Sequence, residues 1–264
     1  MKIHHLRNAT FVIESGENHI LVDPMLSAKG ELPPFAYFRH KLKRNPTVSL
    51  PENASEILDK VTHCIITHSQ KLGFEPLTHT DHLDKPGKSF LTKNNIPVVC
   101  RQQDAPYMAK NRINVQVQVD YWQTEHWLGG EITAIPALHG HSWMHHFMAN
   151  GAGFYIKLPN EPTIYISGDT VYTNDLEKAL IEFKPDIAVV AAGSASLDIG
   201  GPILMPPEEI ITFIKAAPGK VLANHLEALN HCPTTRSQLK KELEQNGLLS
   251  KVLIPEDGET LIID

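Results

Sequence analysis

The sequence has few cysteines, no long apolar run and no excess of positive charge. Its three cysteines, Cys64, Cys100 and Cys232, are far apart and form no CxxC pair, which argues against a disulfide framework and indicates reduced thiols. No segment approaches the roughly 20 apolar residues of a membrane span. The first residues lack the apolar core of a signal peptide. We therefore expect a cytoplasmic protein with no membrane partner.

The charge balance argues against nucleic acid as a partner. The 264 residues include 24 Lys+Arg and 30 Asp+Glu, a formal net charge of −6, so a broad basic surface is not expected. We expect a small-molecule substrate instead, and a homo-oligomer remains open. The 42% hydrophobic residues are typical of a globular chain, and no stretch has the composition of a linker, so a single domain over 1–264 is predicted.

Short apolar runs alternate with amphipathic segments along the chain. Because strand-like runs in both halves are each followed by helices, the pattern predicts two packed sheets with helices outside. Residues 24–52, which include Pro33, Pro34, Pro46 and Pro51, are expected to form a long connection. A capping box at Asn174 and Glu177 is expected to open one helix. The last strands, 252–254 and 260–263, are predicted to form a hairpin.

Four apolar runs end at a side chain of a type that binds metals, and the chain contains 15 histidines. The four side chains are, in chain order, His68, His139, Asp169 and His225. Strands of one sandwich can bring such ends to a common rim. Between the first two, His79, Asp81 and His82 fall within four positions, and His79 and His82 would share a face of a turn entering a helix. Each residue alone has an ordinary structural explanation, and only the joint order indicates a metal site. This set of histidines and aspartates suits Zn²⁺, Mn²⁺ or Fe and does not suit an iron–sulfur cluster.

At these residues the sequence resembles the metallo-β-lactamase-fold hydrolases, and among them the branch that includes the L-ascorbate-6-phosphate lactonases. The resemblance covers nearly the whole chain, including Leu21-Val22-Asp23-Pro24, Gly168-Asp169-Thr170 and the stretch from His225 to His231. It implies an α/β fold, an αβ/βα four-layer sandwich with a two-metal site on one edge. Carried over by position, the first ion would be held by His68, His79 and His139, the second by Asp81, His82 and His225, and Asp169 would bridge them.

One departure from the family pattern bears on the number of ions. The family motif His-x-His-x-Asp-His is interrupted, because residues 70–78 separate His68 and Ser69 from His79. We expect this insertion to loop out over the site, shape substrate entry and leave His68 coordinated. The alternative is a single ion held by Asp81, His82, Asp169 and His225.

The resemblance implies a metal-dependent hydrolase with two divalent ions, Zn²⁺ first, with Mn²⁺ or Fe²⁺ as alternatives. A metal-bound hydroxide would attack a small ester, lactone, amide or phosphoester. Asp81 is expected to orient the nucleophile as well as bind metal. His231 is a candidate to donate to a leaving group or hold an oxyanion, and a structural hydrogen bond is its alternative role. Asp23 is expected to orient a ligand from behind, and Cys232 is expected to be a buried, inert thiol.

Three other functions are weighed against this one. An iron-dependent redox or oxygen-handling protein of the same fold is possible, although the chain has no cysteine cluster and no room for an appended redox domain. A non-catalytic metal-binding module is disfavoured by the complete ligand set. An RNA-processing nuclease is disfavoured by the net charge and by the lack of a basic arm.

Overall fold

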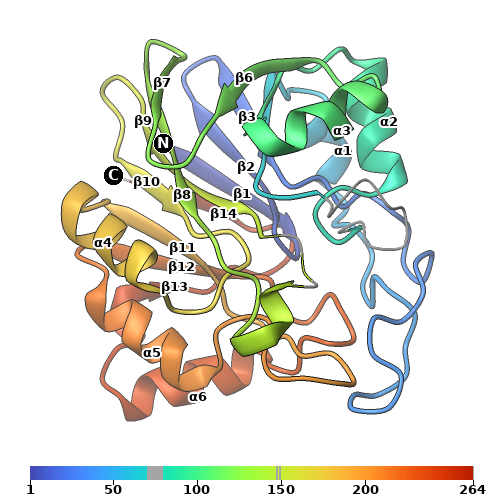
Figure 1. Cartoon of the computed structure of the whole chain (residues 1–264), viewed down its shortest axis with the longest axis vertical. Helices are drawn as coiled ribbons and strands as arrows, with labels where there is room; N and C mark the ends of the chain where they lie inside the picture. Colours follow the sequence, from blue (N-terminus) through green and yellow to red (C-terminus); the bar gives the residue numbers. More distant parts are fainter. Residues whose placement is uncertain (70–79, 147, 149, 264) are drawn as a thin grey trace.

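The computed structural model of the chain describes residues 1–69, 80–146, 148 and 150–263. In this part of the chain the strands form two sheets of seven strands each (Figure 1). The first sheet has the order β14-β1-β2-β3-β4-β5-β6. Its strands are β1 (Lys2–Arg7), β2 (Thr10–Ser15), β3 (Asn18–Val22), β4 (His63–Ile66), β5 (Val98–Arg101), β6 (Val115–Val119) and β14 (Thr260–Ile262).

The second sheet has the order β13-β12-β11-β10-β9-β8-β7. Its strands are β7 (Thr124–Trp127), β8 (Gly130–Pro136), β9 (Ala152–Lys157), β10 (Ile164–Ile166), β11 (Ile187–Ala191), β12 (Lys220–Asn224) and β13 (Val252–Leu253). Strands β10 to β13 are parallel, and β8 has the same direction as β10 because both are antiparallel to β9. The carboxyl ends of β8, β10 and β12 therefore lie at one edge of this sheet.

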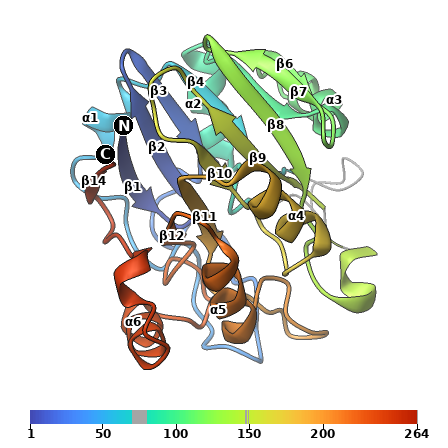
Figure 2. The same cartoon turned by 90° about the vertical axis from the view of Figure 1, so that its left-hand side faces the viewer.

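The helices cover the outer faces of the two sheets (Figure 2). The first sheet is covered by α1 (Ala54–Leu58), α2 (Lys85–Lys93) and α3 (Ala105–Lys110), and the second by α4 (Asn174–Phe183), α5 (Pro207–Ala216) and α6 (Arg236–Gln245). Short 3₁₀ turns lie at η2 (Gln102–Asp104), η3 (Ser142–His146) and η4 (Leu249–Lys251). This arrangement confirms the predicted αβ/βα sandwich.

Alternation along the strands builds the three apolar layers. On β3, Ile20 and Val22 point into the core between the sheets, whereas Leu21 packs toward the helices that cover the first sheet. On the second sheet, Val189 faces the central core and Val190 faces α4 and α5. Both faces of the central strands are therefore buried, which is the reason that these strands are apolar throughout.

The predicted hairpin at the end of the chain is wrong. Strand β13 pairs in parallel with β12 in the second sheet, whereas β14 pairs antiparallel with β1 in the first. The turn before β14 is already bonded to β1, because Gly258 N donates to His5 O at 2.8 Å and His5 N donates to Glu259 O at 2.9 Å. These bonds join residues far apart in the chain, and a local pattern cannot reveal them.

The structure also differs from the sequence prediction at one helix cap and at one strand. The cap of α4 is Thr173, whose side chain accepts a hydrogen bond from Leu176 N at 3.1 Å, so Asn174 is the first helical residue. Strand β7 was not predicted, because its first three residues are polar and exposed. None of the helices in the described ranges is long and apolar enough to cross a membrane.

Candidate metal centre

The strand ends bring the predicted ligands to one place. His68 follows β4, His139 follows β8, Asp169 follows β10 and His225 directly follows β12. All four side chains are at most 3% exposed. Two more candidates, Asp81 and His82, lie in the turn that precedes α2, at 6% and 0% exposure. His79 and the insertion 70–78 lie outside the described residues.

The Asp169 carboxylate is the centre of this cluster. Its Oδ2 lies 3.1 Å from Nε2 of His82, 3.6 Å from Nε2 of His139, 3.6 Å from Nε2 of His225 and 4.0 Å from Nε2 of His68. Potential ligand atoms form two groups that share Asp169, and in each group the atoms lie within 4.8 Å of one another. One group is Asp81, His82, Asp169 and His225, and the other is His68, His139 and Asp169.

Asp81 completes the first of these groups. Its Oδ2 lies 3.8 Å from Nε2 of His82 and 3.9 Å from Nε2 of His225. Its backbone carbonyl accepts a hydrogen bond from the side-chain amide of Asn8 at 3.0 Å. The turn that carries Asp81 is thereby tied to the loop between β1 and β2, and the carboxylate is directed toward two histidines.

Two of the histidines are supported from behind by one carboxylate. Nδ1 of His82 lies 2.9 Å from Oδ2 of Asp23. The same oxygen accepts a hydrogen bond from Oγ1 of Thr67 at 2.7 Å, and that hydroxyl lies 3.1 Å from Nδ1 of His68. The prediction that Asp23 supports a candidate ligand is confirmed by these contacts. The role of Thr67 was missed, because a threonine at a strand end carries no distinguishing sequence signal.

The other two histidines are held through Nδ1 as well. Nδ1 of His139 lies 2.8 Å from the carbonyl oxygen of Ile203, and Nδ1 of His225 lies 3.4 Å from Sγ of Cys232. In all four rings, Nδ1 contacts a protein atom while Nε2 faces the Asp169 carboxylate. This arrangement is typical of metal-binding histidines, whose second nitrogen is held by a neighbouring group that fixes the tautomer and the ring orientation.

The polar atoms of the cluster fit a divalent ion. Within the described residues, Oδ1 of Asp169 and Nε2 of His225 are buried and make no hydrogen bond. Buried polar atoms without partners are costly, and they occur in native structures mainly where an ion or water completes the site. Imidazole nitrogens and carboxylate oxygens are ligands for Zn²⁺, Mn²⁺ and Fe²⁺.

The charges of the cluster keep Asp169 ionised. Burial raises the pKa of the Asp169 carboxyl, but His82 and His225 outweigh burial and hold that pKa well below its ordinary value. Burial likewise lowers the pKa of His82, and the carboxylates of Asp169 and Asp23 raise it well above the usual range. A negative carboxylate is thus available at the point where the four rings meet.

The backbone is locally unusual where it presents these side chains. Gly168 has φ +63°, and a Cβ there would lie 3.0 Å from the carbonyl oxygen of Ala152, so a side chain would be both strained and crowded just before Asp169. His225 itself has φ +59° and Asp23 has φ +45°. Left-handed backbone at non-glycine residues costs free energy and clusters at functional sites.

His231 is buried near the cluster, at 3% exposure. Burial lowers the pKa of His231 to about 4, although the Asp81 carboxylate raises it, so the imidazole is neutral near pH 7. Its ring lies edge-on to Phe35, with 5.3 Å between ring centroids. A neutral imidazole can donate one hydrogen bond and carries no second ring proton.

Asn230, next to His231, anchors the long connection beside the cluster and was not singled out from the sequence. Its Oδ1 accepts from the backbone N of Phe35 at 2.9 Å, and its Nδ2 donates to the carbonyl of Ala36 at 2.6 Å. Oδ1 of Asn45 accepts from Asn230 N at 2.8 Å. The sequence analysis covered Asn230 only as part of the stretch from His225 to His231, and its own contacts could not be predicted.

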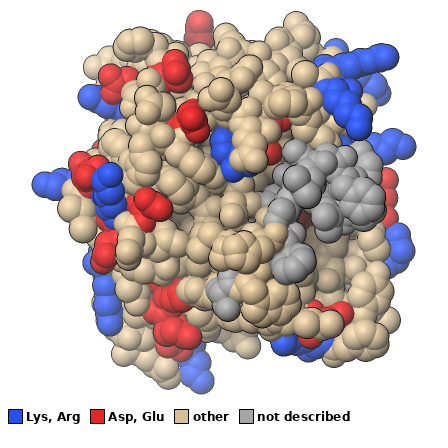
Figure 3. Space-filling view, in the orientation of Figure 1, with Lys and Arg blue, Asp and Glu red and all other residues tan. Residues whose placement is uncertain are grey.

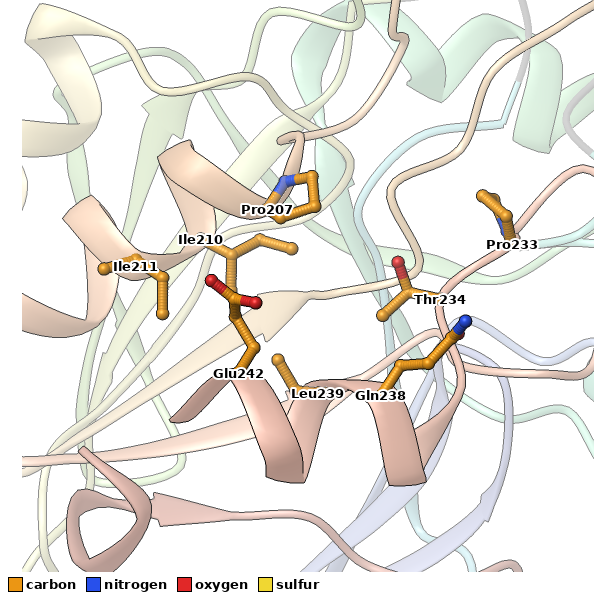
Figure 4. A pocket seen from close by; sticks show the side chains of 8 residues that line it. All are labelled: Pro207, Ile210, Ile211, Pro233, Thr234, Gln238, Leu239 and Glu242. Atoms are coloured by element: carbon orange, nitrogen blue, oxygen red, sulfur yellow. The ribbon is translucent and has the colours of Figure 1, made fainter. Parts of the chain in front are cut away.

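An apolar pocket of about 270 Å³ lies elsewhere, between α5 and α6 (Figure 4). Its floor is formed by Ile210, Ile211 and Leu239, and Glu242 lies at its exposed rim. None of the candidate ligands within the described ranges lines this pocket. On the face shown in Figure 3, positive and negative side chains are mixed along the periphery.

Known proteins resemble this chain over nearly its full length. Residues 18–225 match the β-lactamase superfamily domain. The UPF0173 protein YddR of Bacillus subtilis is 34% identical over 267 residues, which cover 98% of this chain and 99% of the relative. A UPF0173 metal-dependent hydrolase of Caldivirga maquilingensis is 28% identical, covering 95% of this chain and 89% of the relative.

The chain belongs to the UPF0173 family of metal-dependent hydrolases, within the β-lactamase superfamily. Among solved structures, an isothiocyanate hydrolase from Delia radicum gut bacteria is similar, with a TM-score of 0.86 and 32% identity over 100% of this chain and 99% of that one. The predicted family is confirmed by these matches. The closer likeness to the ascorbate-phosphate lactonases stays a prediction.

Proposed function

We propose that this UPF0173 hydrolase binds two divalent metal ions and uses them to add water to a small organic electrophile. The observation that carries the proposal is the convergence of four Nε2 atoms on the Asp169 carboxylate, in two groups that share this residue. His68 and His139, with His79, would hold one ion. Asp81, His82 and His225 would hold the other, and Asp169 would bridge them. Zn²⁺ is the first candidate, and Mn²⁺ or Fe²⁺ are the alternatives.

Bound divalent ions supply a nucleophile by lowering the pKa of water toward about 7, and they polarise an electrophilic substrate. The residues of the chain position and support this chemistry. In this proposal the Asp81 carboxylate, which is directed toward His82 and His225, accepts a proton and orients the attacking water. In this proposal the buried, neutral His231 donates a hydrogen bond to the atom that gains negative charge.

The first substrate class to test is the isothiocyanates. The support is the isothiocyanate hydrolase that shares 32% identity with this chain over the whole of its length. Water adds to the central carbon of R–N=C=S and gives a thiocarbamate, which breaks down to the amine R–NH₂ and carbonyl sulfide. The esters, lactones, amides and phosphoesters of the sequence prediction are the alternatives.

The three free, buried cysteines fit a reducing compartment, which supports a cytoplasmic location as part of this proposal.

The test uses the purified protein loaded with Zn²⁺ or Mn²⁺. Ions per chain are counted, and the release of amine from aryl and alkyl isothiocyanates is measured beside a lactone, a thioester and a phosphodiester. We expect about two ions per chain and turnover that is lost in Asp81→Ala. Asp59→Ala is the matched control, because Asp59 is an exposed residue at the end of α1 that belongs to neither group of candidate ligands and should change nothing. A protein that binds no divalent ion would overturn the proposal.

A further inference from the structure

Cys232 lies directly behind one candidate ligand. Its Sγ is 3.4 Å from Nδ1 of His225, and the two residues are 6% and 0% exposed. The other nitrogen, Nε2 of His225, is buried without a hydrogen bond in the described part of the chain, and it faces Oδ2 of Asp169 at 3.6 Å and Oδ2 of Asp81 at 3.9 Å. The ring is thus held at one nitrogen and open to a cation at the other.

The surrounding backbone permits this close contact. Cys232 N donates to Leu229 O at 3.2 Å, and Thr234 N donates to Gly193 O at 3.3 Å, so the segment that carries the thiol is fixed on both sides. At Gly193 a Cβ would lie 2.3 Å from His225 O and 3.1 Å from Cys232 Sγ. Any side chain at position 193 would therefore push the thiol or the histidine backbone away, and glycine makes their approach possible.

We propose that Cys232 is a positioning residue for metal binding: its sulfur accepts a hydrogen bond from Nδ1–H of His225 and leaves Nε2 free to bind a divalent ion. A neutral imidazole carries one N–H, so a proton on Nδ1 is the condition for a lone pair on Nε2. The opposite bond, from the thiol to Nδ1, would leave the proton on Nε2 and block the metal. This inference rests on the proposed function, and it concerns the ion assigned to Asp81, His82 and His225.

The same division of roles exists at the other three rings, which supports the inference. Each of them has an oxygen atom near Nδ1: Asp23 for His82, Thr67 for His68 and Ile203 for His139. Only at His225 is the partner sulfur, a weaker hydrogen-bond acceptor than oxygen. Cys232 therefore takes the place in this fold that an oxygen takes at the other three rings.

The chain contains two matched controls. Cys64 and Cys100 are also free and fully buried, but they lie in the core between the first sheet and its helices. Alanine at either position also removes one buried sulfur atom, here from an apolar environment, and it changes no contact of the candidate ligands. Any general cost of losing a buried thiol is therefore measured separately from the contact with His225.

The experiment titrates the metal-free full chain with Co²⁺ or Zn²⁺ against a coloured chelator, in wild type, Cys232→Ala, Cys232→Ser and Cys64→Ala. We expect two ions in the wild type, one of them bound about 10–100-fold more weakly in Cys232→Ala, and no change in Cys64→Ala. Cys232→Ser, which restores an acceptor, should recover part of the loss.

The outcomes separate this inference from the proposed function. If the wild type binds no ion, the proposed function fails and the inference fails with it. If the wild type binds two ions and Cys232→Ala binds them equally well, only the inference is overturned. A loss in Cys232→Ala with no recovery in Cys232→Ser would show that the thiol only fills space, which also overturns it. If Cys232→Ala does not fold, the metal affinity of Cys232→Ser decides. Affinity equal to that of the wild type supports the hydrogen bond from His225, and loss of one ion refutes it.

Discussion

Oδ2 of Asp23 lies 2.9 Å from Nδ1 of His82, and both residues are at most 1% exposed. The same carboxylate accepts hydrogen bonds from the side chain and from the backbone N of Thr67, at 2.7 and 2.8 Å. Thr67 directly precedes His68. One carboxylate at the end of β3 therefore fixes two candidate ligands that come from different segments, and it links the two groups of candidate ligands.

Replacing Asp23 by Asn should weaken metal binding. The amide can accept from one of the two neighbours through its oxygen, but its NH₂ group then faces the other donor, so His82 or Thr67 loses its partner. We expect a loss of about 10–100-fold in metal affinity, measured by competition with a chelator. Asp59→Asn, at an exposed position, is the control. Unchanged affinity in Asp23→Asn would show that Asp23 supports the fold alone.

Asp169→Ala should lose both metal and activity. Because its Oδ2 lies within 4.0 Å of the Nε2 atoms of four histidines, its removal takes the shared ligand from both groups. We expect metal content, counted per chain after removal of excess metal, to fall by at least one ion, and turnover to fall with it. Full metal content with unchanged turnover would rule out a bridging role.

Sequence reasoning could name the candidate ligands because their chemistry is local. A metal-binding side chain directly after an apolar strand, as at His68 and His225, is visible in the order of residues, and parallel strands then bring such ends to one edge. The supporting atoms were harder to find. Thr67, Ile203 and Cys232 act through positions that only the folded chain defines, and a backbone carbonyl such as that of Ile203 leaves no trace in the sequence.

The dependence on contacts between distant residues also explains the errors in the predicted fold. The positions of the final strands were predicted almost correctly, but the choice of partner depends on bonds between Gly258 or Glu259 and His5, across almost the whole chain. Strand β7 lacks an apolar face of its own, and it pairs with β8 through backbone bonds that any sequence can make. The apolar pattern of the sequence therefore predicted the two sheets and their helical layers, but it did not predict how the strands at the sheet edges pair.

Acid should remove the stabilisation that the ion pair between Lys2 and Glu14 gives to the fold. The hydrogen bond from Lys2, at 2.6 Å, together with His4, lowers the pKa of Glu14 from 4.5 to about 2. Because the folded pKa lies below the unfolded one, the pair stabilises the protein fully above about pH 4.5, and this stabilisation disappears as the pH falls toward 2. The free energy of unfolding of Glu14→Gln should be lower than that of the wild type by about 1 kcal/mol or less at pH 6, since the pair is partly exposed. Denaturant unfolding at pH 6 and pH 3 should show this difference shrinking, and a constant difference would contradict the assignment.

Arg7→Met should destabilise the fold and displace the long connection. The guanidinium is fully buried and donates to the carbonyl oxygens of Met25, Ser27 and Val48 at 2.8–3.0 Å. Burial lowers the pKa of Arg7 to about 10, so it stays charged at neutral pH. Methionine fills similar space but leaves these carbonyls without donors, at a cost on the order of 3 kcal/mol in urea unfolding. Lys2→Met, at an exposed position, should cost less than about 1 kcal/mol.

Removing the metal with a chelator should lower the thermal stability of the protein. An ion that binds the folded chain and not the unfolded chain stabilises it by about 4 kcal/mol when its free concentration is 1,000 times the dissociation constant. The chelated protein should therefore unfold at a lower temperature, and added Zn²⁺ or Mn²⁺ should restore the transition. Asp169→Ala provides the internal control: it should respond less to chelator and to added metal, because the shared ligand of the two groups is gone. An equal shift in both proteins would mean that the stabilising ion binds outside this cluster.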